Sequence, residues 1–413
     1  MYFKKLFLLP TLLLSLLLSS TFADTNKVNK IMSFSFDDVS WCSRAYNNFG
    51  NSFFNEIFQS KSNIFVSPVS IALALAMTYN GAEGKTKEEM ASVLNISGIK
   101  LSSFNKANEE LIKQLAPDND SLKLSIANSL WAKENEPFKK PFLNIARKFY
   151  NAEIANVNFL NPKTVPRIND WVESKTEDKI KNLLNSGDVG RDTVLVLINA
   201  IYFKDKWQKP FTKRLTKKRN FYLTNGKTNE VPTMSNKDDY LYLETPDYQA
   251  IQLPYSENRL RMVIFLPSKN NSLETFIKKF TKEEWSYILK KFKIKNGTVL
   301  LPKFKLDYKI ELGKILSEMG MPIAFDKHKA NFRKMCILKP NENLFIDKII
   351  HKTFVDVDEL GTEASAATFV VINQITCMPP SQSFKMDINR PFFFTIYDNK
   401  SKAVLFMGTI VEP

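Results

Sequence analysis

The sequence predicts one α+β domain that follows a short export signal. Helical and strand-like segments alternate from about residue 40 onward. Linkers, internal repeats and low-complexity tracts are absent from that stretch. With 413 residues, of which 44% are hydrophobic and 24% charged, the chain has an ordinary globular composition. It therefore has enough apolar side chains to form a large core.

The first residues have the pattern of a secretory signal. Lys4 and Lys5 precede an apolar run from Leu6 to Leu18, and small residues follow up to Ala23. The run is short for a membrane span of about 20 residues, so export is favoured over anchoring in the membrane. We expect residues 1–23 to be a cleaved signal peptide and residues 24–413 to form the single mature domain, outside the membrane.

Helices are expected first in the mature chain. Residues 40–59 have apolar side chains at helical spacing. Pro68 starts the next helix, with Ser67 as its N-cap. Thr86 and Glu89 have capping-box spacing, which predicts a helix beginning at Thr86.

Strands dominate the rest of the chain. The apolar run 192–203 is typical of a strand buried on both faces, and alternation at 355–358 indicates another. Further strands are expected within 249–267, a strand pair or one bent strand at 297–310, and a hairpin over 391–411 that turns at 398–401. Helices are expected at 273–292 and at 311–320, where Gly320 ends the second one.

The net charge of +15 is partly clustered, at residues 213–219 and 290–295. Such clusters attract polyanions, so weak polyanion binding stays open, although a solvated basic face is the simpler interpretation. No nucleic-acid-binding motif accompanies them.

Cysteine and histidine counts restrict the chemistry. The chain has three cysteines, Cys42, Cys336 and Cys377, which are too few for a disulfide scaffold. No Cys-x-x-Cys pair is present, so a structural zinc site is not expected. Whether Cys42 and Cys336 form a disulfide is left open. His328 and His351 are the only histidines, and no nucleophile-elbow, metalloprotease or phosphate-loop motif occurs. The sequence therefore favours no enzyme, no metal and no cofactor, and His351 is expected to be a satisfied core residue.

Residues 361–374, GTEASAATFVVINQ, combine strand propensity with small side chains. Period two puts Thr362, Ala364, Ala366 and Thr368 on one face, where none is charged, and Glu363, Ser365 and Ala367 on the other. A charge on the first face would be buried unpaired if the segment entered a sheet. The pattern thus suits a segment that can become a buried strand.

Several longer segments resemble the serpin family over nearly all of the mature chain. They are NIFVSPVSIALALAMTYNGAEGKT, LINAIYFKDKWQKPF, MGMPIAFDKHKANF, HKTFVDVDELGTEASAAT, MDINRPFFFTI and LFMGTIVEP. The resemblance implies the serpin fold, a multi-helix domain with three β-sheets and an exposed reactive-centre loop, here about 360–385. It also implies a monomer that inhibits a protease when the cleaved loop inserts as a new strand in the central sheet.

The resemblance assigns roles to single residues. The hinge of the loop comprises Gly361, Thr362, Glu363, Ala364, Ser365, Ala366, Ala367 and Thr368. Ser67, Ser70, Asn199 and His351 match the family's shutter, where the sheet opens. Trp207, Lys303 and Glu359 match its breach, at the base of the loop. In inhibitory serpins the scissile residue usually lies fourteen positions after the hinge glycine, which predicts cleavage between Ile375 and Thr376.

Two functions compete on this basis. The small hinge residues favour an inhibitor of an extracellular serine protease, and the absence of Lys and Arg between Glu363 and Ser383 points to an elastase-like or chymotrypsin-like target. The alternative is a non-inhibitory carrier, storage protein or chaperone with the same fold. An unrelated secreted enzyme has no residues in its favour.

Overall fold

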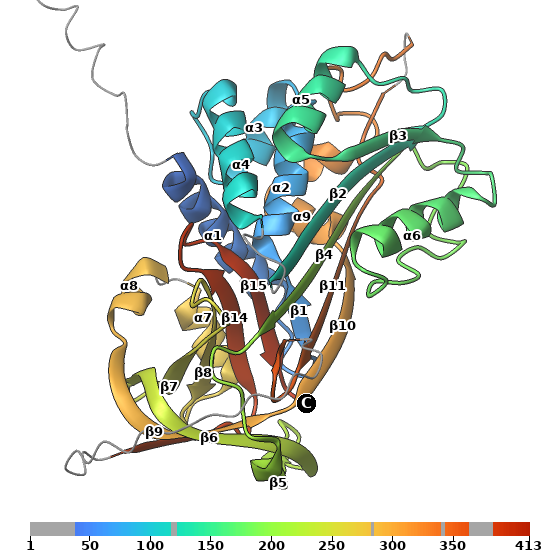
Figure 1. Ribbon diagram of the computed structural model, residues 1–413. Coiled ribbons are helices and arrows are strands. Elements are labelled where there is room, and N and C mark those ends of the chain that lie inside the picture. Colours follow the sequence, from blue (N-terminus) through green and yellow to red (C-terminus); the bar gives the residue numbers. More distant parts are fainter. Residues whose placement is uncertain (1–37, 117–121, 282–284, 340–342, 363–382) are drawn as a thin grey trace, which may run out of the picture. The chain divides into compact units, whose positions relative to one another are not determined.

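The computed structural model describes residues 38–116, 122–281, 285–339, 343–362 and 383–413. Residues Asp38–Pro413 form one compact unit, in which helices and two β-sheets are packed together (Figure 1). The α+β class that the sequence predicts is confirmed. The predicted signal peptide and most of the predicted loop, residues 363–382, lie outside the described residues.

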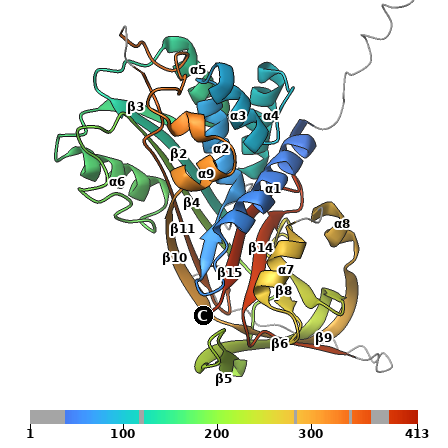
Figure 2. The same cartoon turned by 180° about the vertical axis from the view of Figure 1, so that it is seen from behind.

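The helices gather mainly at one end of this unit (Figures 1 and 2). Pro68 opens α2, and the Ser67 side chain caps it by accepting a hydrogen bond from the Ser70 N–H, as predicted. The helices are α1 (Asp38–Ile57), α2 (Pro68–Tyr79), α3 (Gly84–Val93), α4 (Leu101–Leu115), α5 (Lys140–Tyr150), α6 (Thr164–Lys175), α7 (Leu273–Phe280), α8 (Trp285–Lys290) and α9 (Gly313–Glu318), with 3-10 turns at Lys213–Leu215 and Pro322–Phe325.

Two helix predictions were wrong in detail. Helix α3 begins at Gly84, before Thr86, so the expected capping box is not formed. The Thr86 hydroxyl instead accepts from the Asn331 N–H, and Glu89 accepts from the Ile323 N–H. Both side chains therefore hold a distant segment against α3. The expected helix 273–292 is two separate helices, α7 and α8.

A six-stranded sheet crosses the middle of the molecule in the order β10-β11-β12-β4-β2-β3. Both of its faces are covered: α2 packs on one face and α6 on the other (Figure 1). Alternate residues of β4 therefore enter two different hydrophobic clusters, which explains its continuous apolar sequence. The strands are β2 (Lys123–Lys133), β3 (Glu153–Val157), β4 (Leu195–Lys206), β10 (Phe304–Glu311), β11 (Lys348–Val357) and β12 (Gly361–Thr362).

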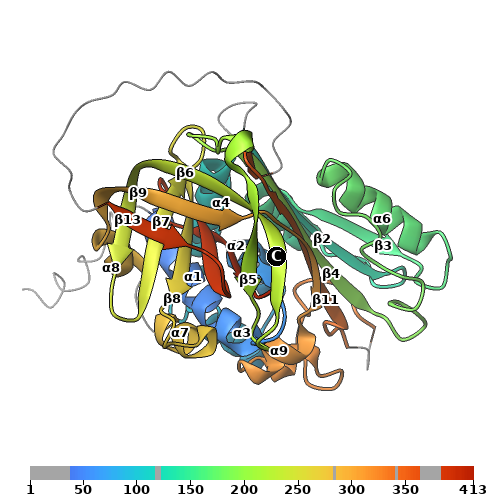
Figure 3. The same ribbon diagram turned by 90° about the horizontal axis from the view of Figure 1, so that it is seen from below.

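The other described strands form one nine-stranded sheet. The sequence interpretation expected three sheets, but β6 is 17 residues long and pairs with β5 along 228–233, with β9 along 233–242 and with β7 along 241–244. It thereby joins what would be two sheets (Figure 3). The strands are β1 (Ile64–Val66), β5 (Lys217–Tyr222), β6 (Thr228–Glu244), β7 (Tyr248–Pro254), β8 (Leu260–Pro267), β9 (Lys293–Pro302), β13 (Phe384–Asp387), β14 (Phe392–Asp398) and β15 (Val404–Ile410).

Candidate functional site

Strand β12 occupies a gap between two parallel neighbours. Residues Lys348–Phe354 of β11 pair in parallel with 196–202 of β4. Beyond that stretch the two strands are separated by Gly361 and Thr362, which pair with Lys206 and Asp205 of β4. Thr362 also pairs with Val357 of β11. The chain thus enters the sheet for two residues, directly before the segment 363–382.

Only glycine fits at position 361. A Cβ on Gly361 would lie 2.2 Å from the Asp205 carbonyl oxygen and 2.6 Å from the Lys206 Cα. Both of these atoms belong to the backbone of β4, which cannot move aside as a flexible side chain could. The absence of a side chain at Gly361 therefore allows β12 to lie against β4.

Thr362 is fully buried at the end of this short strand. Its hydroxyl is 2.7 Å from the hydroxyl of Tyr255, whose ring stacks on Trp207 at a centroid distance of 4.5 Å. Trp207 also donates from its indole nitrogen to the Asp358 carbonyl oxygen at 2.9 Å. Trp207, the predicted breach tryptophan, thus contacts both the residues that lead into β12 and Tyr255, which binds Thr362.

Asp205 is a buried carboxylate beside Thr362 that the sequence interpretation missed. It accepts hydrogen bonds from the Ser256 hydroxyl and the Lys206 N–H, both at 2.8 Å. Burial raises the pKa of Asp205 to about 6, although these two hydrogen bonds oppose the rise. Its place in the every-second-residue row after Ile201 and Phe203 is the sequence signal that could have placed it on the inner face.

Lys303 and Glu359 form the ion pair that the resemblance implies. The Lys303 Nζ is 2.8 Å from a Glu359 carboxylate oxygen, and the Thr216 hydroxyl donates to the other oxygen at 2.7 Å. Burial opposes ionisation of Glu359, but the two hydrogen bonds outweigh it and lower its pKa. Glu359 thus fastens the residues before β12 to Lys303, between β9 and β10, and through Thr216 to the turn that precedes β5.

The four predicted shutter residues meet in one buried cluster, although they come from three distant segments. The Ser67 N–H donates to His351 Nε2 at 3.0 Å, and His351 Nδ1 lies 2.5 Å from Asn199 Oδ1. Asn199 in turn donates to the Ser70 hydroxyl at 2.5 Å and to Asn128 Oδ1 at 2.6 Å. Asn128 lies on β2 and was missed by the sequence interpretation. The cluster links α2 to β4 and β11 at the point where these strands pair.

His351 is held neutral by these contacts. Its Nε2 accepts a hydrogen bond, so the proton is on Nδ1 and is donated to Asn199. Complete burial lowers the pKa of His351 to about 3, and its hydrogen bond with Asn199 only partly offsets that effect.

Acidification should destabilise the protein through His351. The pKa is lower in the folded chain than the ordinary value of 6.5, so its contribution is complete above pH 6.5 and is lost as the pH falls toward 3. Between these values the free energy of unfolding should fall by up to about 1.4 kcal/mol per pH unit from this group. Urea denaturation at several pH values measures the slope. His351→Gln should remove the contribution of one proton to the slope of the free energy of unfolding against pH. His328→Gln, which changes an exposed histidine, should leave that slope unchanged. Equal slopes in both variants would contradict the assignment.

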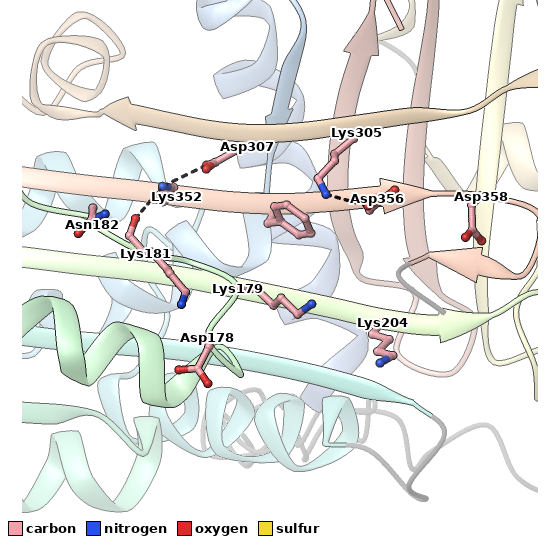
Figure 4. Close-up of a pocket in the computed structure, with 11 residues that line it drawn as sticks. Asp178, Lys179, Lys181, Asn182, Lys204, Lys305, Asp307, Lys352, Asp356 and Asp358 are labelled. Atoms are coloured by element: carbon pink, nitrogen blue, oxygen red, sulfur yellow. Dashed lines mark hydrogen bonds and ion pairs between the residues drawn. The ribbon is translucent and has the colours of Figure 1, made fainter. Parts of the chain in front are cut away.

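A groove of about 760 Å³ lies on the outer face of the six-stranded sheet, beside the gap (Figure 4). Lys352 binds Asp307 at 3.1 Å and the Lys181 carbonyl oxygen at 3.0 Å, and Lys305 binds Asp356 at 3.0 Å. Charges of both signs therefore line the groove, which suits the polar side of an extended segment. Its lining comprises Asp178, Lys179, Lys181, Asn182, Lys204, Lys305, Asp307, Lys352, Phe354, Asp356 and Asp358.

Cys42 and Cys336 are both buried and do not form a disulfide with each other. Burial raises the pKa of each thiol to about 12. Cys377 lies outside the described residues. In the native protein we therefore expect one fast-reacting thiol per chain, at Cys377, when a thiol reagent is added. Peptide mapping identifies the labelled residue, and fast labelling of Cys42 or Cys336 would contradict the expectation.

Other predicted site residues are outside the described part of the chain: Glu363, Ala364, Ser365, Ala366, Ala367, Thr368, Ile375 and Thr376. Within the described residues, no group of three or more His, Cys, Asp or Glu side chains could hold a metal ion. The described helices also include none that is long and apolar enough to cross a membrane.

The gap, the shutter cluster and the breach contacts together define the class of fold. Residues 44–413 match the family described as Serpin (serine protease inhibitor), and the chain belongs to that family. It is similar to a serpin-like protein of Methanosarcina acetivorans, with 35% identity over 97% of this chain and 95% of the relative. The leukocyte elastase inhibitor of Xenopus laevis shares 35% identity over 86% of this chain and 94% of its own length.

Among solved structures, the native state of the thermophilic serpin tengpin is similar to this fold. The TM-score is 0.83 with 34% identity, over 90% of this chain and 94% of that chain. The predicted serpin fold is therefore confirmed. The family is described as one of serine protease inhibitors.

Proposed function

We propose that this chain is a secreted inhibitor of an extracellular serine protease and that it works as a suicide substrate. The protease serine attacks the carbonyl carbon of Ile375, and the peptide bond to Thr376 breaks. The amine of Thr376 leaves with a proton, so the protease remains attached through an ester. Insertion of the freed strand into the six-stranded sheet then distorts the protease before water can hydrolyse that ester.

The observation that carries this proposal is the position of β12. Gly361 and Thr362 lie between β4 and β11. The same two strands pair directly and in parallel over Lys348–Phe354 of β11. The pairing of β12 is antiparallel to both strands. The residues after Thr362 can therefore continue in register if β4 and β11 separate.

Continuing that register assigns a face to each hinge residue. Ala364, Ala366 and Thr368 would lie opposite Val355, Thr353 and His351 of β11, all of which are buried. Glu363 would face outward between Lys204 of β4 and Asp356 of β11, which line the groove. The alternation in the sequence thus agrees with the alternation of the two strands that would receive it.

The register also connects the hinge with the shutter cluster. Thr368 would arrive between His351 and Asn199, whose side chains are joined directly at 2.5 Å. Insertion up to Thr368 must break that hydrogen bond, and the threonine hydroxyl can replace it on either side. The cluster would then act as the last barrier before the strands separate further.

Incubation with pancreatic elastase tests the proposal. We expect a complex that survives boiling in detergent, at the summed mass of both proteins, and a released peptide that begins at Thr376 in mass spectrometry. A new N-terminus at Cys377 or Met378 would shift the cleavage position. Cleavage without any complex, by elastase and by chymotrypsin alike, would reject inhibition and favour a non-inhibitory carrier, storage or chaperone role.

A further inference from the structure

Five cations cluster on β5 and on the turn before it: Lys213, Arg214, Lys217, Lys218 and Arg219, here called the β5 strip. All five side chains are exposed, and none pairs with a carboxylate within the described residues. From 206 to 229 the sequence contains no Asp or Glu at all. Because no acidic residue of this stretch compensates the five cations, the strip is a strongly positive surface.

The β5 strip lies next to both ends of the segment 363–382. At one end, the hydroxyl of Thr216, which directly precedes Lys217 of the strip, donates to Glu359, which precedes β12 by two residues. At the other end, the Tyr222 N–H donates to the Asn389 carbonyl oxygen, just after β13. Figure 3 shows β5, β6, β9 and β13 at this same side of the molecule. A protein held by residues 363–382 would therefore lie close to the strip.

Two exposed apolar side chains accompany the cations. Leu215 is 43% exposed and Tyr222 is 50% exposed. A linear polyanion has only charge to offer to such a surface, whereas a folded partner can cover a leucine and a tyrosine while its acidic groups meet the cations. The observations favour a protein partner.

We propose that the β5 strip is a second contact surface for the protease, and that it selects proteases with an acidic surface beside their active site. This inference rests on the proposed function. The strip acts before cleavage: it accelerates the encounter and orients the protease, and it leaves the later insertion step unchanged. Its effect must therefore depend on ionic strength and appear in the association rate.

Chymotrypsin, used both native and with its surface lysines succinylated, provides the test. The two forms share one active site and differ in surface charge. One variant reverses Lys217, Lys218 and Arg219 to Glu, and a second changes Lys213 and Arg214 to Ser. The control reverses Lys140, Arg147 and Lys148 to Glu; these are exposed residues of α5, at the opposite end of the molecule (Figure 1), and the net charge change is the same.

At low salt, reversal of the strip should slow association with the succinylated enzyme about ten-fold or more, and the difference should vanish at high salt. The serine variant should show a smaller loss in the same direction. The α5 control should stay within about two-fold of the parent chain. With native chymotrypsin, the strip variants should be as fast as the parent chain or faster.

Equal losses in the strip and α5 variants would overturn the inference, because net charge alone would then explain them. Unchanged rates in the strip variants, combined with lost retention on immobilised heparin, would also overturn it and assign the strip to a polyanion. If the parent chain forms no covalent complex with either enzyme form, the proposed function fails, and this inference fails with it. If complexes form at rates independent of the strip, the inference fails alone.

Discussion

Cleavage of the predicted loop should raise the melting temperature by roughly 10–20 °C. The freed segment can extend β12 between β4 and β11, which adds about ten hydrogen bonds worth about 1 kcal/mol each, together with buried side chains. The total is on the order of 10 kcal/mol, and about 1–2 °C per kcal/mol is a reasonable conversion for a domain of this size.

Calorimetry on intact and nicked protein measures this effect. The nicked sample must keep both fragments together, as native gel electrophoresis can check. A second control is protein cut near residue 120, where cleavage frees no strand that could extend β12. Intact and loop-cleaved protein that melt together would show that no insertion follows cleavage, and the inhibitory proposal would be lost.

Thr362→Arg should convert the protein from an inhibitor into a substrate. Thr362 is fully buried against Tyr255 and beside Asp205, in a space that an arginine cannot occupy without displacing β12. With β12 displaced, the charge would have to re-enter the sheet at the first step of insertion, at a cost of about 3 kcal/mol even with partial compensation by Asp205. A barrier higher by that amount slows insertion about 100-fold, so that hydrolysis of the ester becomes faster than insertion.

The measurement is the number of inhibitor molecules consumed per protease inactivated, together with the detergent-resistant complex. In Thr362→Arg, cleavage should continue while the complex disappears. The matched control is Glu363→Arg, which places the same side chain one position further along. There it would face outward, toward the groove that contains Asp356 and Asp358, and inhibition should persist. Loss of inhibition in both variants, or in neither, would contradict the assignment of faces.

The sequence alone determined the class of fold and most of its elements. Helical spacing of apolar residues located α1, because a buried face forces them to recur at the period of the element. The Ser67 cap with Pro68 located α2, and strand-like segments located β4, β7, β8 and the β14–β15 hairpin. Family resemblance also pointed to Ser67, Ser70, Asn199 and His351 before any contact among them was known. These four residues do meet in the fold; their role in opening the sheet stays a prediction.

Only the tertiary structure decided which polar side chains share a buried site. Asn128 and Asp205 are ordinary residues of two strands in the sequence, and they become part of the clusters because β2 and β4 bring them beside Asn199 and Thr362. Thr86 and Glu89 have ideal capping spacing, yet they bind Asn331 and Ile323, which are more than 200 residues away in the sequence. Local patterns specify how a segment can fold, but the partner of a buried polar group depends on which distant segment packs against it, and that is settled only when the whole domain is assembled.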